Sequence, residues 1–167
     1  MTDPSDPANR DPAALPDHAD VVTKPPLIYL AGVLLGLWLG PRFPLPFPIP
    51  WPLRGMIGGA AAILAVAIGV WGVVTFRRAG ERLDPHTPTL KIMIGGPFRW
   101  SRNPLYVGLA ILHAGIGTAL GNAWVVLLLL PVMAVMTWGV VLREERYLER
   151  KFGDEYRRYR SAVRRWL

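Results

Sequence analysis

The sequence predicts an all-α protein, a multi-pass transmembrane helical bundle of about four spans with a cytoplasmic, amphipathic C-terminal helix. Two observations predict this class. Of the 167 residues, 51% are hydrophobic, and they gather in long blocks instead of alternating through amphipathic elements. Charged residues lie outside these blocks or, for Arg54, at the edge of one, as expected of helices surrounded by lipid.

The apolar blocks differ in length. They are Leu27–Gly40, Leu53–Phe76, Leu105–Leu120 and Ala123–Leu142. A spanning helix needs about 20 residues, so the second and fourth blocks are long enough to cross a bilayer. We expect the first block to span as well, because Pro25 and Pro26 suit the start of a helix and Trp38 suits the membrane interface; a re-entrant segment is the alternative.

The net charge of +7 is distributed unevenly along the chain. Residues 77–104 carry six basic and two acidic side chains, and residues 143–167 carry nine basic and five acidic ones. Because Lys and Arg flank membrane spans on the cytoplasmic side, both segments are predicted to be cytoplasmic, and four spans then place the N-terminus there too. In such a chain the positive charge favours membrane lipids as partners over nucleic acid.

The segments outside the spans suggest a domain organisation. Residues 1–24, rich in Asp, Pro and Ala, are predicted to form a disordered N-terminal tail. The alternating prolines of residues 41–52 predict an extended, polyproline-like strap on the outer side of the membrane. Residues 25–167 are predicted to form a single transmembrane domain, with its catalytic half at residues 77–167.

A polar junction, Gly95–Tyr106, lies directly before the third block. Asn103 is expected to cap the helix that starts there, and Pro104 suits its first position. The positive end of the helix dipole then lies beside Arg99 and Arg102 and favours an anion. From the residues alone two interpretations remain open: an anion site, or arginines that set the topology and contact lipid phosphates.

Two adjacent carboxylates, Glu144 and Glu145, follow the fourth block on what we expect to be one continuous helix. Neighbours on a helix point about 100° apart, so at most one of the two is expected to face inward. Taken alone, the Arg-Glu-Glu-Arg stretch is more typical of a solvated helix face with local ion pairs. A cationic ligand at this face would make it a binding site.

The C-terminal segment carries an apolar stripe at helical spacing. Its members are Phe152, Tyr156, Tyr159, Val163 and Trp166, with arginines on the other face. This pattern is typical of an interfacial helix. The helix either lies on the lipid headgroups or folds back over the polar junction as a lid.

Several kinds of site are excluded by the residues present. The chain has no cysteine, so it forms no disulfide and has no thiolate nucleophile. His18, His86 and His113 do not have metal-ligand spacing, and no metal is expected. No strand followed by G-x-G-x-x-G is present, which excludes a Rossmann domain for a nucleotide cofactor.

Inside the apolar blocks, polar and small residues predict helix packing. His113 and Asn122 are expected to hydrogen-bond between helices. Close-packing positions are predicted at Gly58, Gly59, Gly69, Gly72, Gly108, Gly115 and Gly117.

The motifs follow one another in a characteristic order along the chain. The run Gly96–Gly108 is followed by a helical hairpin, then by Glu144-Glu145, Leu148 and the aromatic C-terminal residues. An Arg-(His/Asn)-Pro-x-Tyr element separated by two spans from a Glu-Glu pair is an unusual combination. Over about residues 76–167 the chain resembles the isoprenylcysteine carboxyl methyltransferase and phospholipid methyltransferase superfamily of integral membrane enzymes.

This resemblance implies S-adenosyl-L-methionine as methyl donor, held at the cytoplasmic ends of the last two spans and covered by the C-terminal segment. The implied cofactor-binding residues are Gly96, Pro97, Phe98, Arg99, Trp100, Ser101, Asn103, Pro104, Tyr106 and Glu145. Arg102, Glu144 and Glu145 are the implied catalytic residues. The prenylcysteine enzymes have His where this chain has Asn103, so proton transfer is not expected at that position.

The function predicted on these grounds is a SAM-dependent methyltransferase, integral to the inner membrane or an endomembrane, with a lipophilic acceptor. The acceptor is a small molecule, a lipid headgroup or an isoprenylcysteine-like carboxylate. Two alternatives remain: a non-catalytic membrane scaffold or lipid-binding protein, and a membrane reductase. The reductase is less favoured because the chain is short, although sterol reductases carry a related Arg-x-Pro-x-Tyr element.

Overall fold

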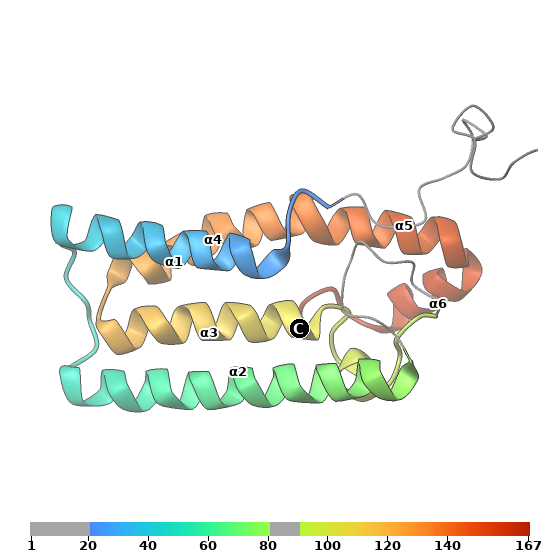
Figure 1. Cartoon of the computed structure of the whole chain (residues 1–167), viewed down its shortest axis with the longest axis horizontal. Coiled ribbons are helices and arrows are strands. Elements are labelled where there is room, and N and C mark those ends of the chain that lie inside the picture. Colours follow the sequence, from blue (N-terminus) through green and yellow to red (C-terminus); the bar gives the residue numbers. More distant parts are fainter. Residues whose placement is uncertain (1–20, 81–90) are drawn as a thin grey trace, which may run out of the picture.

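The computed structural model describes residues 21–80 and 91–167, and these residues form helices and no strand (Figure 1). The helices are α1 (Pro25–Arg42), α2 (Trp51–Ala79), η2 (Gly96–Arg99), α3 (Pro104–Leu120), α4 (Ala123–Met136), η3 (Thr137–Val141), α5 (Leu142–Phe152) and α6 (Asp154–Ala162). The all-α prediction is therefore confirmed for this part of the chain. Most of the expected N-terminal tail, His18 and His86 lie outside the described residues.

Within residues 21–80 and 91–167, two helices are long and apolar enough to cross a membrane. They are α2, with 29 residues, and the continuous helix of α4, η3 and α5, with 30 residues. Each contains one of the two longer apolar blocks. Helices α1 and α3 have 18 and 17 residues, which is roughly 25 to 27 Å of helix against a hydrocarbon core of about 30 Å. That these two also span remains a prediction.

Helix α3 lies between α2 on one side and α1 with α4 on the other (Figure 1). Asn122, at the turn from α3 to α4, accepts from the backbone N–H of Val125 and donates to the carbonyl of Gly36 in α1 at 3.1 Å. The Nε2 atom of His113 lies 2.8 Å from the carbonyl oxygen of Val125. The expected hydrogen bonds between helices are therefore confirmed at both residues.

Small residues let α2 and α3 approach closely. A Cβ atom on Gly58 would lie 2.6 Å from that of Ala119, and one on Gly115 would lie 2.7 Å from a side chain of α2. The packing prediction is confirmed there. It is wrong for Gly59 and Gly69, because a Cβ at either position would meet no atom within 4 Å.

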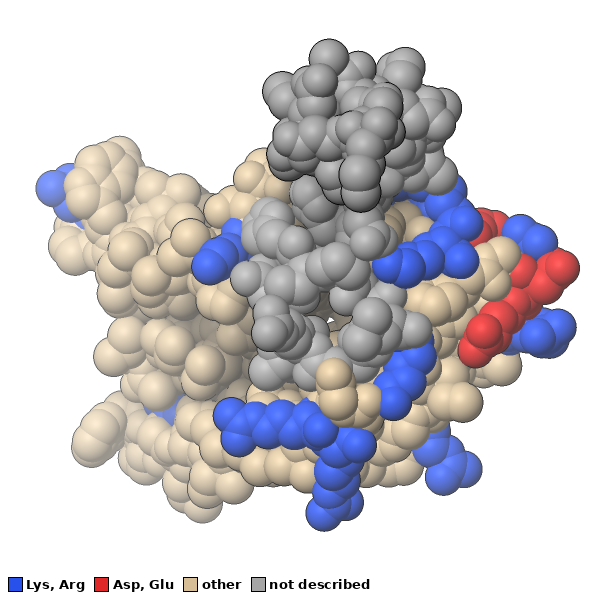
Figure 2. Space-filling model, turned by 45° about the vertical axis from the view of Figure 1, so that its right-hand side comes forward, with Lys and Arg blue, Asp and Glu red and all other residues tan. Residues whose placement is uncertain are grey.

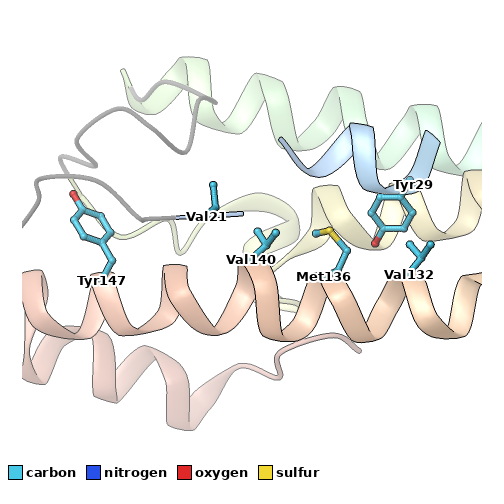
Figure 3. Packing of buried hydrophobic residues seen from close by; sticks show 6 residues of the cluster. All are labelled: Val21, Tyr29, Val132, Met136, Val140 and Tyr147. Carbon is cyan, nitrogen blue, oxygen red and sulfur yellow. The ribbon is translucent and has the colours of Figure 1, made fainter. Parts of the chain in front are cut away.

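A buried apolar cluster follows the long C-terminal helix and joins it to the start of the described chain. Figure 3 shows its members: Val21, Tyr29, Val132, Met136, Val140 and Tyr147. The backbone N–H of Val22 also donates to the carbonyl of Gly139 at 3.2 Å. Val21 and Val22, which the sequence placed in the tail, thus contact the long C-terminal helix.

The proline strap is shorter than expected. It comprises residues 43–50, because α1 continues through Arg42 and α2 begins at Trp51. The indole N–H of Trp124 in α4 donates to the carbonyl of Phe43 at 2.6 Å. This bond fixes the strap to the neighbouring helix.

The chain reverses at Gly153, after α5. Helix α4 passes through the π-helical turn η3 into α5, which confirms that one helix continues past the two glutamates. Gly153 has φ +52, a conformation that residues with a Cβ rarely adopt, and α6 then runs back toward the bundle. Helical structure ends at Ala162 because Val163 is extended, so the last two members of the apolar stripe lie beyond the helix.

Candidate active site

A cavity of about 820 Å³ opens at the end of the bundle where α1 and α3 begin. Its size is within the range of about 300 to 1,000 Å³ that is usual for small-molecule sites. The polar wall comes from the start of α3, from α5 and from α6. The other walls are largely apolar side chains of α1, α2, α3 and η2, together with Lys24 and residues 91–93. In Figure 2 most visible charged side chains gather at the end that carries α5 and α6.

Both glutamates line the cavity, but they contact different partners. Oε1 of Glu144 accepts a hydrogen bond from the hydroxyl of Tyr106 at 2.6 Å. The hydroxyl of Tyr29 donates to the backbone carbonyl of Tyr106 at 3.0 Å, which ties α1 to the same place. The expectation that at most one carboxylate faces inward is wrong, because both line the cavity, Glu144 against Tyr106 of α3 and Glu145 against Arg165 near the C-terminus. Side chains about 100° apart then both reach the cavity.

Glu145 is 6% exposed and stands between two guanidinium groups. Arg165 donates from Nε and Nη2 to the two carboxylate oxygens at 2.8 and 2.9 Å, the fork geometry of a strong ion pair. These hydrogen bonds raise the pKa of Arg165. Nη1 of Arg102 lies 3.0 Å from Oε1 of the same carboxylate.

Arg102 is close enough to Glu145 for an ion pair, yet it has unused hydrogen-bond donors. Its side chain is 9% exposed, and within the described residues Nε and Nη1 have no acceptor in hydrogen-bonding geometry. Leaving buried donors unpaired is costly. Since Arg102 lines the cavity beside the N-terminal end of α3, these donors suit an anionic group of a ligand.

The C-terminal tail, residues 163–167, pairs with the polar junction. The backbone N–H of Arg102 donates to the carbonyl of Arg164 at 2.9 Å, and Nδ2 of Asn103 donates to the carbonyl of Arg165 at 2.9 Å. The hydroxyl of Ser101 donates to the same carbonyl of Arg165 at 3.3 Å. Of the two arrangements expected for the C-terminal segment, the structure has the one that folds back over the junction.

Helix α6 closes the same end of the cavity with two tyrosines. Tyr156 is buried, and Tyr159 donates its hydroxyl hydrogen to the carbonyl of Phe98 at 2.8 Å. Burial raises the pKa of both phenols, so both are neutral at physiological pH. They therefore contribute aromatic surface and hydroxyl groups to the cavity, not charge.

Asn103 makes a different contact from the one expected. Its side chain does not cap α3, although Pro104 does occupy the first turn. The side-chain amide donates to the carbonyl of Arg165 in the tail, and the backbone N–H of Asn103 donates to the hydroxyl oxygen of Ser101 at 3.1 Å. The cap prediction is wrong because the folded-back tail offers a carbonyl that the local sequence could not indicate.

The residues predicted for the site divide into two groups. Those that line the cavity are Phe98, Arg102, Asn103, Pro104, Tyr106, Glu144 and Glu145. Those that do not are Gly96, Pro97, Arg99, Trp100 and Ser101. Trp100 is 69% exposed and packs edge-on against Trp71 of α2, with ring centroids 5.4 Å apart. The junction thus has an inner side toward the cavity, while Trp100 faces α2 and Ser101 faces the tail.

Sequence reasoning missed Arg165 and the contribution of α2. Arg165 is one of five arginines among residues 157–167, and its spacing does not distinguish it from the others. Apolar wall residues such as Ala65 and Gly69 lie outside the recognised motif. Among the described residues, no group of three or more His, Asp or Glu side chains is arranged to hold a metal ion.

Comparison with known proteins adds a family match. A family model described as phospholipid methyltransferase matches residues 53–155, which run from α2 to the start of α6. A protein of Haemophilus influenzae described as uncharacterized is 43% identical over 63 residues, which are 38% of this chain and the whole of that protein. No solved structure matches the chain.

Proposed function

Since this chain belongs to the phospholipid methyltransferase family, we propose that it transfers a methyl group from S-adenosyl-L-methionine to a lipophilic acceptor in the membrane. One observation carries the proposal. A guanidinium with unused donors, two carboxylates and a tyrosine meet in a cavity that continues between apolar helices. A polar cofactor and a lipid-soluble acceptor can share such a site.

The side chains of the polar wall fit this cofactor. The unused donors of Arg102 suit its carboxylate. Glu144, whose described partner is the neutral Tyr106, suits a cationic ammonium or sulfonium group. Glu145 already faces two guanidinium groups, so we assign it the task of holding Arg102 and the tail in place. Phe98 and Tyr159 offer aromatic surface for a base.

The proposed mechanism asks the protein to bind and orient. When bound, the cofactor supplies an activated methyl group for an in-line displacement. Helix α6 and the tail cover the polar wall and exclude water, while the cavity aligns the acceptor. An amine acceptor needs a carboxylate to take its proton, and Glu144 lines the cavity for that role. A carboxylate acceptor needs only a cation to orient it.

Binding of S-adenosylhomocysteine to the detergent-purified protein tests the proposal. We expect this ligand to raise the melting temperature, because it stabilises only the folded state, and we expect NADPH to have no effect. Stabilisation by NADPH alone would favour the reductase alternative. If neither ligand changes the melting temperature of a folded preparation, the non-catalytic scaffold is favoured instead.

Matched variants test the assignment of the polar wall. Arg102→Ala and Glu145→Ala are each expected to weaken the stabilisation by S-adenosylhomocysteine. Arg160→Ala should not, because Arg160 pairs with Glu149 near the surface. Equal losses in all three would indicate general electrostatics. Tritiated methyl transfer into a membrane lipid extract then identifies the acceptor without a guess about its structure.

A further inference from the structure

The cavity has an apolar arm that leads away from the polar wall. Its sides are Leu27 of α1, Ala65 and Gly69 of α2, and Leu109 and Leu112 of α3. From the start of α3 at residue 104 to residue 112 the arm follows the helix for roughly 12 Å. It therefore runs alongside α2, a helix long and apolar enough to cross a membrane.

The missing side chain of Gly69 keeps this arm open. A Cβ atom there would meet no other atom within 4 Å, although the residue lines the cavity. At Gly58 and Gly72 on the same helix, by contrast, a Cβ would lie 2.5 to 2.6 Å from a side chain of α3. Gly69 is thus not needed for helix packing, and its small size leaves space beside the cavity.

We propose that Gly69 determines how bulky a hydrocarbon chain of the methyl acceptor the apolar arm admits. The inference rests on the proposed function, which places the reacting group at the polar wall. A molecule that fills both parts of the cavity must be an amphiphile with a polar end and an apolar chain. A helix from a second protein does not fit, because it is about 10 Å across and the whole cavity has only about 820 Å³.

A second apolar hollow provides an internal comparison. It lies between α1 and α4, has a volume of about 410 Å³, and is lined by residues such as Leu35, Pro131 and Val135. None of its lining residues is charged. A lipid can rest there, but nothing in that hollow would hold the polar end of an acceptor.

Photolabelling of the full chain in detergent tests the arm directly. The probe is palmitic acid with a diazirine on its chain, and the labelled peptides are mapped by mass spectrometry. We expect labels in residues 65–69 and 108–112. Gly69→Leu should reduce them at least fivefold and Gly69→Ala by less, while Gly59→Leu should leave them unchanged because Gly59 lies on α2 away from the cavity. A Cβ atom at Gly69 or Gly59 meets no other atom within 4 Å, and leucine favours a helix more than glycine does.

The outcomes separate this inference from the function it rests on. Labels confined to the hollow between α1 and α4, no labels in the arm, or equal labelling in the Gly69→Leu and Gly59→Leu variants would overturn the assignment of the arm. Stabilisation by S-adenosylhomocysteine is measured in the same preparations. If it is absent while labelling follows the size of residue 69, the arm is a lipid site and the methyltransferase proposal fails. If stabilisation is present without such labelling, the methyltransferase proposal stands and the assignment of the arm fails.

Discussion

The chain segments around the polar wall of the cavity and those beside its apolar arm are joined by different kinds of interaction. Around the polar wall, hydrogen bonds and ion pairs join segments far apart in the sequence, such as Asn103 and Arg165, which are 62 residues apart. Beside the apolar arm, α2 and α3 meet through small residues such as Gly58 and Gly115. The polar wall therefore depends on the chemical identity of its side chains, whereas the apolar part depends on their volume.

Removing the charge at the centre of the polar wall should destabilise the protein most. Glu145→Gln leaves Arg102 buried without a counter-charge and removes an acceptor of Arg165. Breaking a buried pair in this way should lower the free energy of unfolding by about 3 kcal/mol. Thermal unfolding in detergent measures the change.

The matched control is Glu149→Gln. Glu149 pairs with the more exposed Arg160, so its loss should cost less than about 1 kcal/mol. Equal destabilisation by the two substitutions would show that burial does not distinguish the two pairs.

A larger side chain at the contact between α2 and α3 should have the next largest effect on stability. Gly58→Leu forces α2 away from Ala119 and should destabilise the protein by about 2 kcal/mol, as overpacking usually does. Gly59→Leu on the next position has free space and should change stability by less than about 0.5 kcal/mol. The same unfolding measurement checks both. Similar melting temperatures for the two variants would mean that these helices are not close-packed in the membrane.

The smallest expected effect concerns the tail alone. Arg165→Ala removes two hydrogen bonds to Glu145 but leaves the pairing with Arg102. The loss of about 1.5 kcal/mol should speed hydrogen exchange at the backbone N–H of Arg102 by about tenfold, because that N–H is bonded to the tail. Arg164→Ala keeps the backbone contacts and should not change the exchange rate. Unchanged exchange in Arg165→Ala would mean that the backbone bonds alone hold the tail.

The apolar part of the fold was largely predictable from the sequence. Blocks without charge indicate lipid-facing helices, and the positions of α2 and of the long C-terminal helix follow from them. The role of a given glycine did not follow, because Gly58 and Gly59 look alike in a sequence while only one of them faces α3. Helical phase relative to a neighbour is a property of the assembled bundle.

The polar wall was predictable in its members but not in their pairing. The motif pointed to Arg102, Tyr106, Glu144 and Glu145, all of which line the cavity. Arg165 could not be found, since ion pairs between distant segments leave no local pattern in an arginine-rich tail. At most one of the two glutamates was expected to face inward, because helical spacing alone does not show where the tail contacts the helix.

The pairing of the tail with the junction also has a consequence for the order of folding. Contacts across short turns, such as that between α3 and α4 at Asn122, close small loops and form early. The bond between Asn103 and Arg165 closes a loop of about sixty residues and contains the whole helical hairpin within it. We therefore expect the helices to be in place before the polar wall assembles. An assembled site is then a signature of a chain that has completed its folding.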